Sequence, residues 1–476
     1  MREESTASTP RRPAPNPWVV LFTVVTMTFM STLDSSIVNV ALPAMQRELS
    51  VSATSIQWVS SIYLLTCCAA VLVFGRLGDM FGKMRLFQAG VALFTAGSLL
   101  CGLSTSLPAL IAARVVQGVG AASATATNMG IVTEAFPSSQ RGRALGIVAT
   151  FVSLGLMCGP TIGGMLVAAF PWESIFLINV PIGVVSFLVG VWTLPEDASG
   201  TQRETFDIAG AITVAPAIFL VFYALTSLVE SVTPFACVLL AIGVACMVAF
   251  VAVERRATYP LVSFDIFRRP GVALNVATMF FCFFAVGGTE FLLPFYLQNA
   301  CGFSPDIAGL ALTAIPIAMA AVGPIAGAVS DRIGSSIPCL VGLSIYAAGI
   351  FLTGVLPANA TLPVIVASMA FMAAGTGMFQ SPNNSLVMGA VETSQLGFAG
   401  SLVSLVRYLG MSAGVTGGTA LLYGRMSAEA GYPVSAYIEG RADLFLSGYS
   451  FAFTVFAALC AVSAVATALQ LVRRRM

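Results

Sequence analysis

The sequence predicts an all-α integral membrane protein with fourteen membrane-spanning helices, and three observations support this fold class. Only 9% of the 476 residues are charged and 57% are hydrophobic, whereas a soluble domain carries roughly 25% charged residues to cover its wet surface. Apolar runs long enough to cross a bilayer core, which needs about 20 residues of helix, recur along the whole chain. A loop motif from the first half also returns in the second half.

The predicted spans form three groups along the chain. Six lie near residues 18–42, 53–74, 86–104, 108–132, 143–169 and 175–194; two lie near 207–228 and 233–253; and six lie near 272–297, 306–329, 337–356, 362–389, 396–423 and 446–472. We therefore expect a cytoplasmic N-terminal segment (1–17), a six-helix bundle (18–194), a central linker with two extra helices (195–270), a second six-helix bundle (271–472) and a basic cytoplasmic tail (473–476).

Basic residues are concentrated in every second connection between these spans. Only Arg47, Arg425 and Arg441 lie in the other connections, and Arg114 and Arg407 lie within spans. The remaining seventeen of the 22 lysines and arginines share one side. Because cytoplasmic loops carry the excess of positive charge, we expect both termini in the cytoplasm and a multi-pass protein of a bacterial inner membrane.

Composition excludes several classes of function. The chain has no histidine, so proton chemistry near neutral pH would fall to carboxylates. Its ten cysteines lie mostly inside apolar runs and lack metal-ligand spacing. We expect no metal and no cofactor beyond a proton gradient, no catalytic residues and no enzyme activity. A net charge of +1 gives no reason to expect nucleic acid. The expected partners are the bilayer and a small, amphipathic substrate, with the protein a monomer.

An internal repeat links the two halves of the chain. Gly75–Gly82 follows the second span and Gly327–Gly334 follows the tenth, and both read G-x-x-x-D-x-x-G. Both loops lie on the cytoplasmic side and at the same place in a six-helix block. Such symmetry is typical of secondary carriers, which rock two halves about a site near the middle of the membrane.

Two opposite charges lie at similar depth in the first block. Asp34 is about 24 Å from the cytoplasmic end of its span and Arg114 is about 9 Å from the outer end of its own, at 1.5 Å per residue. Either charge alone would cost several kcal/mol in the membrane, so we expect them to be partners. The pair has two interpretations: a purely structural ion pair, or a switch in which protonation of Asp34 releases Arg114.

Four motifs in this order resemble the major facilitator superfamily, and within it the branch of fourteen-span drug:proton antiporters. They are Leu33–Pro43, Gly75–Arg85, Arg114–Gly120 and Gly155–Gly164, the last followed by Phe176–Gly183. The resemblance covers nearly the whole chain. It implies two pseudo-symmetric six-helix bundles plus two inserted central helices, and a proton-coupled exporter of hydrophobic or amphipathic small molecules that works by alternating access.

The resemblance also implies roles for individual residues. A conformational latch would use Gly75, Asp79, Arg85 and Asp331, although the same residues suit an ordinary solvated turn. An antiporter motif between the two halves would use Gly155, Gly159, Pro160, Gly163 and Gly164. Glycines every fourth residue equally suit general helix packing, and the proline bends the helix.

Proton coupling is expected to involve Asp34, Arg114 and Glu290. Glu290 has two interpretations, a carboxylate of the outer vestibule or an interfacial one, and the partner of Arg407 is open. Aromatic surfaces suit apolar ligands, so the expected substrate cavity comprises Asn39, Tyr63, Gln117, Phe284, Glu290, Phe379, Arg407 and Tyr408. The alternative function is a narrow-specificity exporter of a lipid or an endogenous metabolite, and sodium remains an alternative to protons.

Overall fold

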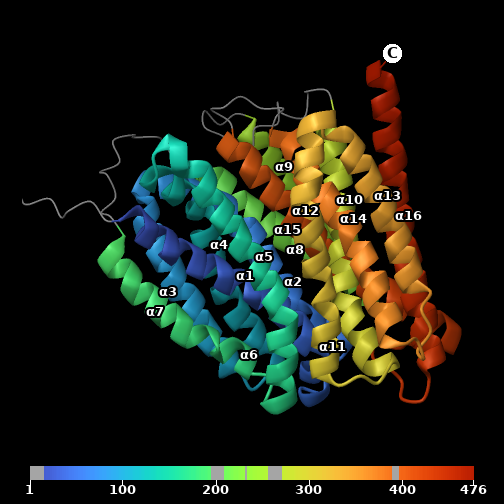
Figure 1. Cartoon of the computed structure of the whole chain (residues 1–476). Helices are drawn as coiled ribbons and strands as arrows, with labels where there is room; N and C mark the ends of the chain where they lie inside the picture. Colours follow the sequence, from blue (N-terminus) through green and yellow to red (C-terminus); the bar gives the residue numbers. More distant parts are fainter. Residues whose placement is uncertain (1–15, 195–207, 231–232, 256–270, 389–395, 476) are drawn as a thin grey trace, which may run out of the picture.

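The computed structural model describes residues 16–194, 208–230, 233–255, 271–388 and 396–475, and these residues form helices joined by short turns, with no strand among them (Figure 1). The elements are α1 (Pro17–Glu48), α2 (Ala53–Phe81), α3 (Lys83–Gly102), α4 (Leu107–Ala135), α5 (Ser138–Ala169), α6 (Ser174–Leu177), α7 (Asn179–Thr193), α8 (Ile208–Glu230), α9 (Pro234–Glu254), α10 (Val272–Phe295), the π-helical turn η2 (Tyr296–Ala300), α11 (Pro305–Leu312), α12 (Ala314–Ile333), α13 (Ser336–Gly354), α14 (Leu362–Met388), α15 (Leu396–Ala430) and α16 (Ala442–Arg475).

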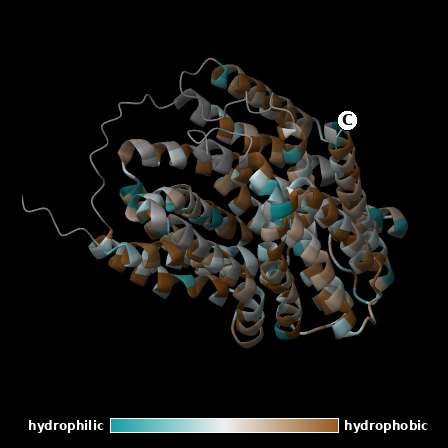
Figure 2. Ribbon diagram, turned by 45° about the horizontal axis from the view of Figure 1, so that its top comes forward, coloured by the Kyte–Doolittle hydropathy of each residue, from teal (hydrophilic) through white to brown (hydrophobic). Residues whose placement is uncertain are grey.

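The helices are long and apolar, as expected for a membrane protein (Figure 2). In the described parts of the chain, twelve segments are long and apolar enough to cross a membrane, with α6–α7, α10–η2 and α11–α12 each forming one of them. Two further long helices lie where spans are predicted: α8, whose described apolar stretch is Thr213–Ala224, and α15. The all-helical membrane class is confirmed, and the count of fourteen spans stays a prediction at α8 and α15.

The helices gather into two groups that lie side by side (Figure 1). Helices α1 to α7 pack on one another, and α10 to α16 form the second group. The inserted pair, α8 and α9, packs mainly on itself and reaches the two groups through α2 and α15. The groups meet along two seams, α2 against α15 and α5 against α11.

The loop repeat has the same backbone geometry in both groups. Gly82 ends α2 with φ 104°, and Gly334 ends α12 with φ 84°. Each donates its backbone N–H to the carbonyl four residues earlier, of Gly78 and of Ser330 respectively. Residues with a side chain rarely adopt positive φ, which explains why the last position of each motif is glycine.

A glycine crossing also recurs in the two groups. A Cβ added to Gly90 of α3 would lie 2.8 Å from the carbonyl oxygen of Gly120 of α4. A Cβ on Gly342 of α13 would lie 2.9 Å from that of Gly375 of α14. Both pairs of helices therefore approach closely at equivalent points, which gives a common register for comparing the two bundles.

The glycines of α5 divide between two partners, which corrects the expectation that the whole motif lies between the halves. Gly155, Gly159 and Gly163 face α1 within the first bundle, where added Cβ atoms would collide with Thr32, Ser36 and Ile37 respectively. The contact with the other half is made one residue later. Gly164 packs against Gly309 of α11, and the carbonyl oxygen of Pro160 also faces Gly309.

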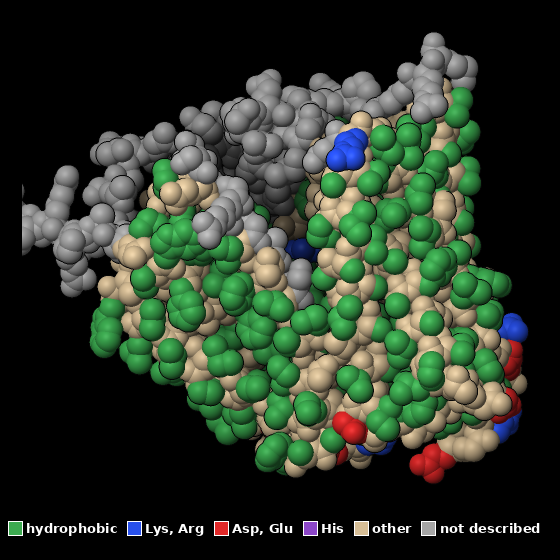
Figure 3. All heavy atoms as spheres, in the orientation of Figure 1, with side chains coloured by type: hydrophobic (Ala, Val, Ile, Leu, Met, Phe, Trp, Pro, Cys, Tyr) green, Lys and Arg blue, Asp and Glu red, His purple; other side chains and the backbone are tan. Residues whose placement is uncertain are grey.

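The two bundles meet closely at the end remote from the C-terminus. There Gln298 of η2 donates to the carbonyl of Val40 at 3.0 Å, and the backbone N–H of Ala53 donates to the carbonyl of Ser435 at 2.9 Å. Toward the other end the space-filling view shows a recess between the bundles with a basic side chain in its depth (Figure 3). Cβ atoms added to Gly75 or Gly323 would meet nothing within 4 Å.

The α1–α5 contact predicts different effects for two identical substitutions. Gly159→Ala should lower the unfolding temperature of the purified protein in detergent, because its methyl group would collide with Ser36, and overpacking of this kind costs about 1–3 kcal/mol. Gly323→Ala is the matched control. It fills open space and should leave the temperature unchanged or raise it, since alanine favours helix by about 1 kcal/mol. Equal unfolding temperatures for the two variants would contradict the close contact.

Candidate functional site

A fully buried ion pair lies in the middle of the first bundle. Arg114 Nη1 of α4 lies 2.6 Å from Asp34 Oδ2 of α1, and the two side chains are 1% and 0% exposed. The sequence prediction that these charges are partners is confirmed. An isolated charge is costly at this depth, so each of the two residues can lie there only because the other balances its charge.

Three further polar side chains complete the environment of Asp34. Its Oδ1 atom accepts hydrogen bonds from Gln117 Nε2 at 2.8 Å and from Asn179 Nδ2 of α7 at 3.0 Å. Gln117 also donates to Ser98 Oγ of α3 at 2.9 Å and accepts from Arg114 Nη1 at 2.6 Å. The carboxyl group receives hydrogen bonds from three side chains, an arrangement that suits its ionised, acceptor-only form.

Arg114 is held on its other sides by α2 and by Phe176 of α6. Its Nε atom donates to the carbonyl oxygen of Val59 at 3.0 Å. The guanidinium carbon lies 4.2 Å from the centre of the Tyr63 ring and 5.6 Å from that of Phe176, distances at which a cation is attracted by an aromatic face. Arg114 therefore ties α1 and α2 to α4 at one point.

Small residues let the helices come close enough for these bonds. A Cβ on Gly97 of α3 would lie 2.6 Å from the backbone nitrogen of Gln117, and one on Gly118 would lie 2.9 Å from Thr66 of α2. Glycine at these positions lets α3 and α2 both pack closely on α4. The short hydrogen bonds to Gln117 and from Arg114 depend on this close packing.

The network can carry out one simple chemical step. A proton on Asp34 would remove the countercharge of a buried arginine, and leaving one member of a buried pair alone costs about 3–5 kcal/mol. Arg114 would then have to find another partner or the helices would have to move. In the present conformation Asp34 has no exposed surface, so proton exchange with water requires a rearrangement of the surrounding helices.

Several residues predicted to line the substrate cavity lie elsewhere, which corrects that list. Gln117 and Tyr63 belong to the buried network and are 0% and 4% exposed. Phe379 is 1% exposed and packs in the core of the second bundle, where its backbone meets Gly342. Their polar or aromatic character suggested that they line a cavity, but each side chain is buried in contacts inside one bundle.

The other predicted cavity residues are partly buried and do not form one cluster. Asn39 accepts a hydrogen bond from Ser60 at 3.2 Å, and Phe284 packs against Phe456. The Arg407 guanidinium lies 5.1 Å from the ring centre of Tyr408, near the α2–α15 seam. Glu290 borders a separate small cavity in the second bundle.

The predicted latch lies largely beyond what the structure describes. The backbone of Gly75 and Asp79 is in the last turns of α2, and Asp331 is in the last turn of α12. The side chains of both aspartates are outside the described set, and Arg85 is exposed. At the same end Lys83 forms an ion pair with Glu134 at 2.6 Å. The latch remains a prediction.

Sequence reasoning missed Asn179 and Ser98 as members of the network. Asn179 lies within a quoted motif and is a polar residue in an apolar span, which is the signal that could have identified it. Ser98 carries no such signal, because serine in a transmembrane helix usually bonds to its own backbone. Ser98 Oγ does donate to the Phe94 carbonyl at 2.8 Å as well as accepting from Gln117.

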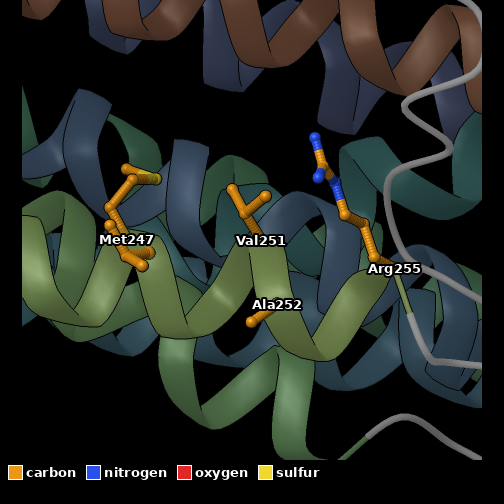
Figure 4. Close-up of a pocket in the computed structure, with 5 residues that line it drawn as sticks. Met247, Val251, Ala252 and Arg255 are labelled. Carbon is orange, nitrogen blue, oxygen red and sulfur yellow. The ribbon is translucent and has the colours of Figure 1, made fainter.

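A hollow of about 430 Å³ runs along α9, outside this network. Its described lining is Met247, Val248, Val251, Ala252 and Arg255, with the arginine at one end (Figure 4). None of the residues around Asp34 lines it. The hollow contains no acidic residue among its described walls, and we assign it no chemistry.

The ion pair leads to a prediction about stability. Arg114→Met should strongly destabilise the protein, by about 3–5 kcal/mol, because it leaves Asp34 buried without a countercharge. The double variant Asp34→Asn with Arg114→Met should recover much of that loss, because it removes both charges. Thermal unfolding of the purified variants measures both. A double variant no more stable than Arg114→Met would show that the charges contribute independently of each other.

Comparison with known proteins agrees with the geometry. The sequence profile of the Major Facilitator Superfamily matches residues 24–415, with a second match over 278–475. The riboflavin transporter RibZ of Clostridioides difficile (strain 630) is 34% identical over 400 residues, covering 83% of this chain and 86% of that protein. The tetracenomycin C resistance and export protein of Streptomyces glaucescens is 29% identical over 490 residues, covering 94% and 90%.

A drug-resistance relative and a solved structure extend the likeness. The multidrug resistance protein Stp of Mycobacterium tuberculosis (strain CDC 1551 / Oshkosh) is 32% identical over 394 residues, covering 81% of this chain and 72% of that protein. A bacterial homologue of the human lysosomal transporter Spinster, solved inward-facing and unoccupied, has the same fold with a TM-score of 0.69 at 16% identity, covering 96% and 98% of the two chains. The chain belongs to the Major Facilitator Superfamily, a family of membrane transporters.

Proposed function

We propose that this transporter is an antiporter that exports small amphipathic molecules in exchange for protons. The observation that carries the proposal is the buried network around Asp34. The network places one carboxylate and one arginine, both essentially unexposed, at the centre of a bundle. With no histidine in the chain, a carboxylate is the group left to bind a transported proton near neutral pH.

The relatives support export of organic molecules. Proteins named for multidrug resistance and for tetracenomycin C export match this chain over most of its length. The riboflavin transporter RibZ, with 34% identity, supports the second candidate, a transporter of narrow specificity for one metabolite. Transport assays with a panel that contains riboflavin, tetracenomycin C and unrelated drugs separate the two, since a narrow transporter would move only one class of compound.

The position of Arg114 suggests how a proton could change the conformation. Arg114 bonds α1 through Asp34 and α2 through Val59. The same two helices carry the contacts that close one end, from Val40 and Ala53 to the second bundle. A proton on Asp34 would weaken the tie between α1 and α2 and so change the stability of that closed end. The intact contact between Asp34 and Arg114 in this structure would then correspond to the state after proton release.

The charge distribution supports an orientation in which the closed end faces the outside of the cell. Arg47 lies in the last turn of α1 at this end, and Arg425 and Arg441 lie at the same end of the second bundle. These are the three basic residues on the poorly charged side, which the positive-inside rule places outside. The recess would then open to the cytoplasm, where a substrate for export enters.

This orientation predicts a labelling pattern. Single cysteines introduced at Ser52 and Ser435, in a variant without other cysteines, should react with a membrane-impermeant maleimide added outside intact cells. A cysteine at Ser199, in the predicted cytoplasmic linker and outside the described residues, should react only after the cells are opened. Labelling of Ser199→Cys in intact cells would overturn the orientation or the position of the inserted pair.

The coupling proposal is tested by neutralising Asp34. In liposomes with an imposed pH gradient, Asp34→Asn should abolish uphill transport while retaining some downhill exchange, because the amide preserves hydrogen bonding and cannot take up a proton. The readout is accumulation of the panel compound that the unmodified protein transports best. Glu429→Gln, at an exposed ion pair with Arg425, is the matched control and should transport as the unmodified protein does. Uphill transport by Asp34→Asn would place the coupling site elsewhere.

A further inference from the structure

The second bundle lacks the partners that hold Asp34 in the first. Gly97 packs against the backbone of Gln117 in α4, and Gly349 packs against the backbone of Met372 in α14. Together with the glycine crossings described above, this places Met372 at the position of Gln117. By the same register Met369 of α14 occupies the position of Arg114. The basic and amide groups of the first bundle are therefore replaced by thioethers.

The second bundle nevertheless contains a carboxylate of its own. The backbone nitrogen of Leu33 faces Gly155 of α5, and the backbone nitrogen of Phe284 faces Gly410 of α15 in the same way. Leu33 and Phe284 therefore occupy equivalent positions in the two bundles. Asp34 directly follows Leu33, whereas Glu290 lies six residues after Phe284. Glu290 is thus five residues, or about 7.5 Å, further along its helix toward the closed end. The two bundles carry acids of different depth and different surroundings.

Glu290, which is itself partly exposed, borders a narrow, partly open cavity of about 10 Å³ between α10, α12, α13 and α14. The polar atoms of its walls come from hydroxyl groups of Thr289, Tyr346 and Thr376, and the remainder is aliphatic or thioether. No lysine or arginine is among these lining residues. Within the described part of the chain Glu290 forms no ion pair, in contrast to Asp34.

A hydroxyl group in the same cavity also lacks a partner. Tyr346 is 1% exposed, and its hydroxyl makes no hydrogen bond of ordinary geometry to the described residues, although the Thr289 hydroxyl lies close to it. The neighbouring Thr289 hydroxyl donates its hydrogen to its own helix, at the carbonyls of Ala285 and Val286. Buried polar groups without hydrogen bonds are rare and costly, so the Tyr346 hydroxyl beside a carboxyl group points to a ligand between them.

The size and chemistry of the cavity restrict that ligand. A volume of about 10 Å³ is close to the lower limit for one water molecule, so an organic ammonium group does not fit. Hard metal cations take six or more oxygen ligands, and the walls offer one carboxyl group and three hydroxyls. A proton on the carboxyl group, with one water linking it to the tyrosine, satisfies both polar groups.

We propose that Glu290 and Tyr346, bridged by one water molecule, form a second proton-binding site that belongs to the second bundle. Glu290 takes up the proton and becomes a neutral carboxylic acid, which can remain in apolar surroundings without a countercharge. Tyr346 is a positioning residue that orients the acid through the water. Unlike Asp34, whose proton competes with an arginine, this site holds its proton without breaking an ion pair.

The charged and titratable surroundings of this site are sparse. The titratable neighbours of Tyr346 are Glu290, Cys282 of α10 and Cys460 of α16. The described lining from α12 and α14 is Ile315, Met319, Met372, Ala373 and Thr376, none of which carries a charge. Arg407 and Arg425 of α15 contact other residues, the Tyr408 ring and Glu429 respectively. Titration at this site should therefore reflect Glu290 itself.

Infrared difference spectroscopy tests the site directly and does not require transport. Purified protein in liposomes, compared between acidic and alkaline buffer, should show the carbonyl stretch of a buried protonated carboxylic acid. Glu290→Gln should lose the component of that band that comes from Glu290 and keep any component from Asp34. Tyr346→Phe should keep the Glu290 component and shift its frequency and its titration midpoint, because the acid loses its hydrogen-bonded water. Glu429→Gln, an exposed acid, should keep the band unshifted. An identical buried-acid band in all four proteins would overturn the proposal.

A transport measurement then shows whether this proton is carried. In liposomes with imposed membrane potentials, the potential at which net flux reverses gives the number of protons exchanged per substrate molecule. Glu290→Gln should exchange one proton fewer than the unmodified protein, and an unchanged ratio would show that the site does not take part. If the unmodified protein shows no proton-driven transport, the antiport proposal fails, while the infrared result still decides the binding site. If Glu290→Gln does not fold, the shift in Tyr346→Phe decides.

Discussion

The ion pair between Asp34 and Arg114 is the interaction on which the first bundle depends. Both charges are essentially unexposed, so neither could remain ionised there without the other. Arg114 needs further acceptors, and it finds them in Gln117 and in a carbonyl of α2. The need to satisfy one buried arginine therefore brings parts of several helices to a single point in the membrane.

That requirement also limits how the helices can pack. The polar groups reach one another only because glycines let the helix backbones approach, as Gly97 does against Gln117. Glycines also allow the close contact between α5 and α1, and Gly164 and Gly309 allow the close contact between the first bundle and the second. Close contact within a bundle and close contact between bundles thus come from neighbouring residues of one helix.

The comparison of the two bundles separates what the repeat preserves from what it does not. The helix-ending glycines of the two loops and the α3–α4 and α13–α14 crossings are equivalent. The charged network is not repeated, because methionines occupy the places of its arginine and glutamine. Backbone architecture is preserved because both bundles need the same close packing, whereas the polar chemistry is particular to each. An acid without a countercharge and an acid within an ion pair respond differently to protons.

The membrane class, the approximate position of each helix, the repeat and the Asp34–Arg114 pairing could all be predicted from the sequence. These follow from local rules, since apolar length sets a span and an unpaired charge at a given depth demands a partner. Tertiary structure alone decided which of the polar and aromatic side chains line a cavity, because that depends on the direction in which each helix face turns. Gln117, Tyr63 and Phe379 are the examples, since all three are buried in packing rather than open to a cavity. The division of the α5 glycines between α1 and α11, and the small cavity between Glu290 and Tyr346, likewise arise from helices that are distant in sequence, whose crossing no local pattern encodes.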